Sequence, residues 1–221
     1  MKRSDLLRAV CFDLDGTLIN SEDLYEQAGC EVLRRRGKTY DPVLREQVMG
    51  RPAVDSLRVM IEFHSLPDTV EELVRESGEL MLKLMETSLA VMPDVYELLN
   101  ELDAARIPYG VATSATRDYA NYVLARLEID KRFQFVLTAE DIQHGKPHPE
   151  VYLLAAERFG IAPPQMMVLE DSANGCRSAV AAGAFTVAVP NHHTHKHDFT
   201  GVRFVAKALT DPRICRALGY S

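Results

Sequence analysis

Four short segments of the 221-residue chain combine acidic, hydroxyl and basic side chains in patterns that can do chemistry. In chain order they are FDLDGTL (Phe12–Leu18), VATSA (Val111–Ala115), HGKPHPE (His144–Glu150) and the acidic pair Glu170–Asp171. Carboxylates that lie close together repel one another, and a hard divalent cation relieves that repulsion. Donor sets made only of oxygen favour magnesium over zinc. A cation, a lysine and a hydroxyl suit a bound phosphate, so the segments together predict a magnesium-dependent phosphoryl-transfer site.

The four segments lie at the boundaries of predicted strands and helices. The apolar run 6–12 ends against Asp13, and the turn signal Asp15-Gly16 follows it, which indicates a buried strand. Further strands are predicted at 109–112, 135–137, 166–169 and 185–189, separated by helices at 94–105, 117–127, 149–159 and 174–182. Strands that alternate with helices predict an α/β fold with a doubly wound parallel sheet. Such sheets bind ligands beyond the carboxyl ends of their strands, so we expect the segments to converge there.

The stretch between the first and second predicted strands differs in character, because from Asn20 to Val91 no strand is indicated. Ser21 is a plausible N-cap of a first helix, and Asp68 with Glu71 has the spacing of a capping box. We therefore expect an inserted helical domain at residues 19–91, and a core domain made of residues 1–18 and 92–221.

Each signal alone has an ordinary explanation. An Asp after a strand is often a turn residue, Lys146 could be a surface lysine, and Glu170-Asp171 could cap a helix. The pattern Asp-x-Asp-Gly-Thr fixes four residues, however, and a chance match in a chain of this length has a probability on the order of 0.1%. The ordered occurrence of all four segments at element boundaries therefore favours a functional site.

With these segments the chain resembles the haloacid dehalogenase superfamily of phosphohydrolases, in the branch with a helical cap inserted after the first strand. The motifs that carry the resemblance are Asp13-x-Asp15-Gly16-Thr17, Thr113 with Ser114, Lys146-Pro147, and Glu170-Asp171-Ser172-x-x-Gly175. The resemblance extends over essentially the whole chain. It implies a Rossmann-like core, a helical cap that closes over the site, and Mg²⁺ as the cofactor.

The resemblance also implies a role for each motif residue. Asp13 would be the nucleophile that becomes an aspartyl phosphate, and Asp15 would protonate the leaving alcohol and then deprotonate the attacking water. Thr113, Ser114 and Lys146 would bind the phosphoryl oxygens. Asp13, Asp171 and the backbone carbonyl of Asp15 would contact the metal, with Glu170 either as a ligand or as the holder of a water.

Within this branch two activities remain open. Dehalogenases do not use the second aspartate, so Asp15 argues against them. A β-phosphoglucomutase-like mutase shares the motifs, but it carries a histidine at the position of Tyr25 and an arginine at that of Ala53. We therefore predict hydrolysis of a small phosphorylated metabolite, a sugar phosphate or a nucleoside or nucleotide monophosphate. The mutase is the alternative, and a non-catalytic binding protein on the same fold a more distant one. Glu22, Tyr25 and Arg51 are candidates for substrate contact from the cap.

The amino-acid composition narrows the classes of partner that the protein is expected to bind. Asp and Glu number 32 against 25 Lys and Arg, a formal net charge of −7, which argues against nucleic acid as a partner. No apolar run reaches the roughly 18 residues of a membrane helix. The four cysteines have no Cys-x-x-Cys spacing, which suits a reduced, cytoplasmic protein, and we expect it to act as a monomer. The histidines at 192, 193, 195 and 197 are expected to lie in a solvated loop rather than to bind metal.

Overall fold

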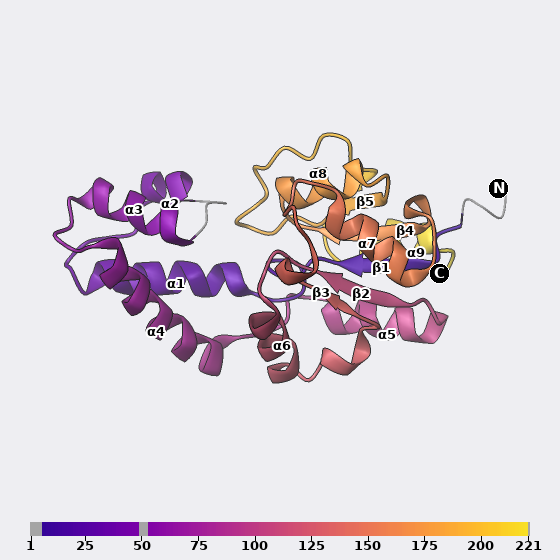
Figure 1. The fold of residues 1–221 in the computed structure, drawn as a ribbon, viewed down its shortest axis with the longest axis horizontal. Helices are drawn as coiled ribbons and strands as arrows, with labels where there is room; N and C mark the ends of the chain where they lie inside the picture. The colour runs from indigo at the N-terminus through magenta and orange to yellow at the C-terminus, as the bar shows by residue number, and fades with distance from the viewer. Residues whose placement is uncertain (1–5, 49–52, 221) are drawn as a thin grey trace. The chain divides into compact units, whose positions relative to one another are not determined.

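The computed structural model of the chain describes residues 6–48 and 53–220 and is drawn in Figure 1. It divides into two compact units. The core unit comprises Met1–Asn20 and Ala90–Ser221, and the insertion unit comprises Ser21–Leu89. Each unit is described by itself below. Among the described residues, none of the helices combines the length and the apolar character needed to cross a bilayer.

The core unit is built on a six-stranded sheet in the order β3-β2-β1-β4-β5-β6, in which every pairing is parallel. The strands are β1 (Ala9–Phe12), β2 (Tyr109–Ala112), β3 (Val136–Leu137), β4 (Met166–Glu170), β5 (Phe185–Ala188) and β6 (Phe204–Val205). Because β1 pairs with β2 on one side and β4 on the other, the strand order reverses at β1. A ligand site is therefore expected beyond the carboxyl end of β1. The predicted α/β fold with a parallel sheet is confirmed.

Helices cover both faces of this sheet, with α7 and α8 on one side and α5 on the other (Figure 1). The helices of the core unit are α5 (Val95–Ala105), α6 (Arg117–Arg126), α7 (Glu150–Phe159), α8 (Ala173–Ala181) and α9 (Pro212–Leu218). Successive strand residues face opposite sides of a sheet. Cys11 accordingly packs in a core cluster with Tyr152 and Ala179, whereas the next residue, Phe12, meets the rings of Tyr109 and Phe133 edge-on.

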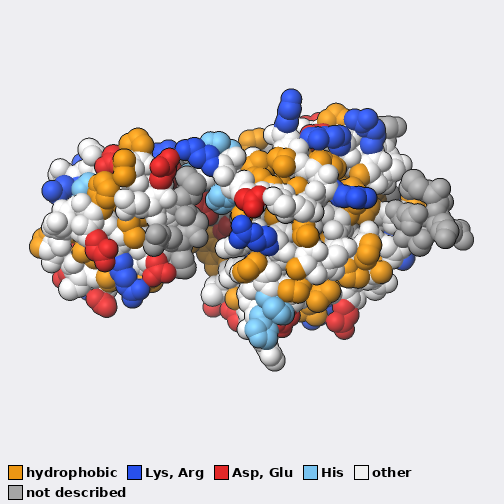
Figure 2. All heavy atoms as spheres, turned by 90° about the horizontal axis from the view of Figure 1, so that it is seen from above, with side chains coloured by type: hydrophobic (Ala, Val, Ile, Leu, Met, Phe, Trp, Pro, Cys, Tyr) orange, Lys and Arg blue, Asp and Glu red, His pale blue; other side chains and the backbone are white. Residues whose placement is uncertain are grey.

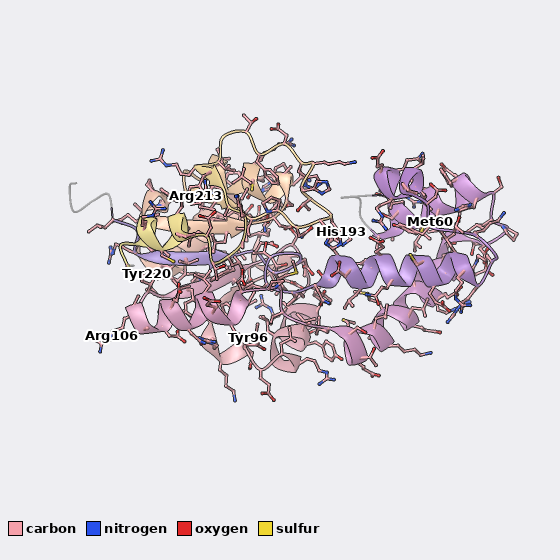
Figure 3. All side chains as sticks on the ribbon, turned by 180° about the vertical axis from the view of Figure 1, so that it is seen from behind. Met60, Tyr96, Arg106, His193, Arg213 and Tyr220 are labelled. Carbon is pink, nitrogen blue, oxygen red and sulfur yellow. The ribbon has the colours of Figure 1, made fainter. Side chains whose placement is uncertain are left out.

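The structure corrects several predicted boundaries of the sheet. The first strand begins at Ala9 rather than near residue 6, because only from there does the chain pair with β4. The strand β4 continues one residue further than predicted, to Glu170, which pairs with Ala188 of β5. The elements β6 and α9 lie beyond the last predicted strand. Arg213 of α9, labelled in Figure 3, anchors that helix to β6: it donates to the Val205 carbonyl at 2.7 Å and lies over the Phe204 ring.

In its described residues, 21–48 and 53–89, the insertion unit has four helices with an apolar core of their own. They are α1 (Ser21–Arg34), α2 (Pro42–Val48), α3 (Ala53–His64) and α4 (Val70–Ser88). The core gathers Val32 of α1, Leu44 of α2, Met60 of α3 and Leu73 of α4; Met60 is labelled in Figure 3. Acidic and basic side chains are interspersed on the face of this unit seen in Figure 2.

Two predicted caps in the insertion unit are wrong. Ser21 is the first residue of α1, and its buried hydroxyl has no hydrogen-bond partner among the described residues. The capping box of α4 lies one residue later than predicted: the Glu72 N–H donates to the Thr69 hydroxyl, and the Thr69 N–H donates to the Glu72 carboxylate. Asp68 has the same spacing to Glu71, but its carboxylate is bound by Arg36 instead.

Candidate active site

Three acidic side chains meet at the carboxyl ends of β1 and β4. Asp13 directly follows β1, Glu170 is the last residue of β4, and Asp171 comes next. All three are buried, and carboxylate oxygens of the three lie within 4.8 Å of one another. At such separations each pair of like charges repels by about 4 kcal/mol in an environment of effective dielectric constant 20. This cluster therefore needs cations close by.

Lys146 is the cation that the chain itself supplies. Its Nζ donates to Asp13 Oδ1 at 2.6 Å, to Glu170 Oε1 at 3.1 Å and to the Ala112 carbonyl at 3.1 Å. Only 6% of the side chain is exposed, and its ammonium group lies 5.0 Å from the centre of the Tyr152 ring. Burial on its own lowers the pKa of Lys146, but the adjacent carboxylates outweigh burial and raise the pKa well above its ordinary value. Lys146 is therefore charged at neutral pH.

One lysine does not neutralise the negative charge of this cluster, as the pKa of Asp13 shows. Burial, together with the charges of Glu170, Asp171 and Asp15, raises the pKa of the Asp13 carboxyl well above its ordinary value, although Lys146 acts in the opposite direction. A further cation at the cluster would lower that pKa again. The electrostatics therefore call for a second positive charge beside Asp13.

The packing around the carboxylates fits a hard divalent cation. A Cβ at Gly175 would lie 1.9 Å from Glu170 Cδ, and a Cβ at Gly16, whose φ is +78°, would lie 2.6 Å from Asp171 Oδ2. Both acidic side chains thus occupy space that only a glycine leaves open. The backbone N–H and the hydroxyl of Ser172 also donate to Glu170 Oε2, at 3.1 and 2.9 Å. The result is a set of fixed oxygen donors, which is the kind of site that magnesium prefers.

Asp15 belongs to a separate hydrogen-bonded group beside the cluster. Its Oδ2 accepts from the Thr113 hydroxyl at 3.4 Å, and its Oδ1 accepts from the Tyr119 hydroxyl at 3.1 Å. Thr113 directly follows β2, and its Oγ also accepts from the backbone N–H of Ala115 at 2.9 Å. The next residue, Ser114, is exposed at the end of the same strand. The structure thus brings Asp13, Asp15, Thr113, Lys146, Glu170 and Asp171 to one edge of the sheet.

Two site residues were missed by the sequence analysis. Asn191 donates through Nδ2 to Asp171 Oδ2 at 2.9 Å and to the Gly16 carbonyl at 3.0 Å, so it joins two of the motifs. Asn191 follows β5 by three residues, and applying the strand-end argument to that strand could have found it. The contact of Tyr119 with Asp15 comes from α6, and no local pattern in the sequence marks it.

The candidate cap residues lie in the insertion unit or outside the described residues. Glu22 and Tyr25 are in the first turns of α1, where Glu22 is half-buried and Tyr25 is exposed. Arg51 lies outside the described residues. Substrate contact by these three residues stays a prediction.

The histidine run after β5 forms a hydrogen-bonded turn. Asn191 Oδ1 accepts from the backbone N–H groups of His193 and Thr194, and His195 Nδ1 lies 2.8 Å from the His192 carbonyl. His193 is labelled in Figure 3. His197 is not fully solvated: the backbone N–H of Ala173 contacts its Nδ1 at 3.3 Å, and burial lowers its pKa.

Comparison with known proteins agrees with this geometry. The family model described as haloacid dehalogenase-like hydrolase matches residues 10–189. A phosphorylated carbohydrates phosphatase of Thermotoga maritima is 33% identical over 177 residues, which cover 80% of this chain and 82% of that protein. A probable pseudouridine-5′-phosphatase of Drosophila melanogaster is 34% identical over 206 residues, 90% of this chain and 89% of that protein.

A solved structure gives the same result at the level of the fold. The crystal structure of a putative β-phosphoglucomutase from Thermotoga maritima superimposes with a TM-score of 0.82 at 29% identity, covering 95% of this chain and 99% of that one. The family match runs from the second residue of β1 to the residue after β5 and so includes all four motifs. The chain therefore belongs to the haloacid dehalogenase-like hydrolases, and within them to the phosphatase branch, whose members hydrolyse phosphoric monoesters.

Proposed function

We propose that this protein is a Mg²⁺-dependent phosphatase that hydrolyses a small phosphorylated metabolite through an aspartyl phosphate on Asp13. The observation that carries the proposal is the buried cluster of Asp13, Glu170 and Asp171, which Lys146 alone does not neutralise. In this proposal Asp13, Glu170, Asp171 and the backbone carbonyl of Asp15 hold the ion. When bound, Mg²⁺ stabilises negative charge on the phosphoryl oxygens and favours the ionised form of Asp13.

In the first step an oxygen of the Asp13 carboxylate forms a bond to phosphorus while the bond between phosphorus and the ester oxygen breaks. Lys146 fixes the attacking carboxylate through its 2.6 Å contact to Oδ1 and stays charged throughout. Ser114, Thr113 and Lys146 would donate hydrogen bonds to the phosphoryl oxygens and stabilise their negative charge. For this, the Thr113 hydroxyl would turn from Asp15, and one N–H of Lys146 would turn from the Ala112 carbonyl, toward the phosphoryl group. The leaving oxygen takes its proton from Asp15.

In the second step Asp15, now a carboxylate, takes a proton from water as that water attacks the phosphorus of the aspartyl phosphate. Inorganic phosphate leaves and the Asp13 carboxylate is restored. The Tyr119 hydroxyl, which contacts Asp15 Oδ1, orients this carboxyl group for both proton transfers, and Thr113 holds Asp15 Oδ2 when no phosphoryl group is bound. Tyr119 is thus a positioning residue in this mechanism.

We further propose that the insertion unit acts as the cap of the enzyme, which limits the access of water during the reaction. Glu22, Tyr25 and Arg51 are its candidates for substrate contact. Two relatives, a phosphorylated carbohydrates phosphatase and a probable pseudouridine-5′-phosphatase, support a sugar phosphate or a nucleoside monophosphate as substrate. We expect a cytoplasmic monomer without nucleic-acid or membrane partners.

A phosphosugar mutase is the second candidate, and it is favoured by the likeness to the putative β-phosphoglucomutase. Against it, Tyr25 and Ala53 stand where such mutases are expected to carry a histidine and an arginine. Without the arginine a sugar bisphosphate gains little affinity from its second phosphate. The intermediate should then be hydrolysed rather than passed to a second hydroxyl.

The test is a phosphate-release assay, first with an aryl phosphate with and without Mg²⁺, then with a panel of phosphorylated sugars and nucleosides. Asp13→Asn serves as the negative control. We expect release that requires Mg²⁺, and no conversion of β-glucose 1-phosphate to glucose 6-phosphate. Efficient isomerisation that depends on a glucose bisphosphate would establish the mutase instead. No release from any substrate would favour the non-catalytic alternative.

A further inference from the structure

Three potential metal ligands lie together on the segment that carries Lys146, outside the carboxylate cluster. His144, His148 and Glu150 each offer one ligand atom, and these atoms lie within 4.8 Å of one another. Glu150 Oε2 is 2.9 Å from His144 Nδ1 and 3.7 Å from His148 Nδ1. The two imidazole rings face each other with their centres 4.6 Å apart. The mechanism proposed above uses none of these three side chains.

The backbone holds this group in place. Glu150, the first residue of α7, accepts the backbone N–H groups of Gln143 and His144 through its two carboxylate oxygens, at 2.8 and 2.9 Å. The hydrogen bond from Gln143 lowers the pKa of the Glu150 carboxyl, so this group is ionised at neutral pH. The buried hydroxyl of Ser178 on α8 donates to the His148 carbonyl at 2.7 Å. The segment that carries these three side chains therefore needs little further ordering when a metal ion binds.

We propose that His144, His148 and Glu150 form a binding site for Zn²⁺ or a transition-metal ion of similar preference, separate from the magnesium site. In a tetrahedral zinc site with bonds of 2.0–2.1 Å, neighbouring ligand atoms are about 3.3 Å apart. The two observed distances from Glu150 Oε2, 2.9 and 3.7 Å, lie on either side of that value. Each of these two distances is therefore within about 0.4 Å of the value for a zinc site, and the two imidazole ligand atoms, which lie within 4.8 Å of each other, would move closer together when an ion binds.

The donor set selects the metal. Two imidazole nitrogens and one carboxylate suit Zn²⁺, Cu²⁺ or Ni²⁺, whereas Mg²⁺ prefers sites made only of oxygen. The rings of His144 and His148 are 62% and 50% exposed at the side chain, so an ion reaches them from solvent without any opening of the fold. The ligands stand on both sides of Lys146, so an ion bound there ties together the two ends of the segment that supplies the lysine of the catalytic cluster.

The experiment is a calorimetric titration of the full chain with Zn²⁺ in the presence of excess Mg²⁺, which keeps Zn²⁺ away from the carboxylate cluster. His148→Gln and His144→Gln each remove one ligand, and His195→Gln is the matched control because His195 is an exposed histidine elsewhere in the core unit. We expect both ligand variants to lose at least about tenfold in Zn²⁺ affinity, since even outer-shell changes cost 10–100-fold, while the control keeps its affinity.

A second readout is the melting temperature, because an ion that binds only the folded state stabilises it. Zn²⁺ should raise the melting temperature of the wild type and of His195→Gln, and raise it less in His148→Gln; circular dichroism checks that every variant is folded. Equal Zn²⁺ affinity in the wild type and in both ligand variants would overturn the proposal, as would an equal loss in the His195→Gln control. Because neither readout is enzymatic, the result stands whether or not the phosphatase proposal holds.

Discussion

Lys146 in the core unit and Arg36 in the insertion unit are alike in one respect: each binds two carboxylates with its charged group. The Lys146 ammonium lies 2.6 and 3.1 Å from its two partners, and one nitrogen of the Arg36 guanidinium lies 2.7 Å from each of its own. The side chains differ in burial, at 6% and 18% exposed. They differ more in the balance of charge around them.

In the insertion unit the charges are matched. Arg36 binds Asp68 with two parallel hydrogen bonds and Glu76 with a third, and Arg35 binds Glu76 from the other side. A fourth hydrogen bond, from Arg36 to the Val32 carbonyl, ties the group to the end of α1. Arg35 also binds Glu31, which pairs with Arg34, so three guanidinium groups face three carboxylates. The arrangement fixes the turn after α1 to the beginning of α4.

In the core unit the charges are not matched. Lys146 faces Asp13 and Glu170, and Asp171 adds a third carboxylate within 4.8 Å, so three carboxylates gather around one ammonium group. A buried excess of negative charge costs stability unless a cation binds. Both units contain clusters of charged side chains. The comparison teaches that equal numbers of positive and negative groups mark a structural ion-pair cluster, whereas an excess of carboxylates marks a metal site.

The largest effect is expected from Asp13→Asn, which removes both the nucleophile and one negative charge of the unbalanced cluster. Phosphatase activity should fall by a factor on the order of 10⁴–10⁶, as for other lost nucleophiles. Without metal, the free energy of unfolding should stay the same or rise. The substitution removes a repulsive negative charge, and the ion pair between Lys146 and Glu170 remains. Phosphate release and urea unfolding in a chelating buffer measure the two effects. A variant that is inactive because it is less stable would contradict this account.

Asp15→Asn should affect chemistry without affecting the ion. Asp15 is bound by Thr113 and Tyr119 and is not among the three carboxylates that cluster. Loss of the general base should lower kcat by roughly 10²–10⁴-fold with either substrate, because both form the same phosphoenzyme. Loss of the general acid should slow formation of the phosphoenzyme from an alkyl phosphate, and much less from an aryl phosphate, whose leaving group needs no proton. Mg²⁺ titrations should give the wild-type affinity. Rapid-quench measurement of phosphoenzyme formation separates the two steps, and an equal slowing of that first step with both substrates would argue against proton donation by Asp15.

One glycine in each unit extends the comparison from the charged side chains to the backbone. Gly175→Ala would place a methyl group 1.9 Å from Glu170 Cδ, so the carboxylate must move, and we expect a 10–100-fold loss of Mg²⁺ affinity. Gly78 of α4 has open space around its Cα, so Gly78→Ala should stabilise the insertion unit by about 0.5–1 kcal/mol. Metal titration and urea unfolding of both variants check these opposite outcomes. If Gly175→Ala kept the wild-type affinity, the packing argument for the site would fail.

The sequence predicted what depends on local signals. Short apolar runs located the strands, and the strand ends located Asp13, Thr113 and Asp171, because parallel strands place their carboxyl ends at one edge. The capping box was displaced by one residue because Asp68 and Thr69 have the same spacing to a glutamate, and only the contact of Asp68 with Arg36, 32 residues earlier, decides between them.

The missed contacts are those that join distant parts of the chain. Asn191 reaches Gly16, 175 residues before it, and Tyr119 reaches Asp15 across 104 residues. No local pattern marks Tyr119 of α6, and although Asn191 lies near a strand end, its hydrogen-bond partners are fixed only by the packing of the whole sheet. Sequence reasoning therefore found the charged groups and missed the residues that orient them.

The smallest effect is expected at the matched cluster. Arg36→Gln removes the two hydrogen bonds to Asp68 and the hydrogen bond to Glu76. Because these groups are partly exposed, we expect the free energy of unfolding at pH 7 to fall by only about 1 kcal/mol. Arg34→Gln is the control, since Arg34 is mostly exposed and pairs with Glu31 on the same helix, so its loss should be clearly smaller than that of Arg36→Gln. Urea unfolding followed by circular dichroism measures both.

The difference in unfolding free energy between the wild type and Arg36→Gln should depend on pH, and this dependence tests whether the difference is electrostatic. Hydrogen bonds from Arg36 lower the pKa of both Asp68 and Glu76 in the folded chain. A carboxyl whose pKa is lower when folded contributes stability above its unfolded pKa, about 3.9 for Asp and 4.3 for Glu, and loses it as the pH falls toward the folded value. The gap between the wild type and Arg36→Gln should therefore be full at pH 7 and shrink below about pH 4. A gap that stayed constant with pH would mean that Arg36 acts by packing and by its bond to the Val32 carbonyl rather than by charge.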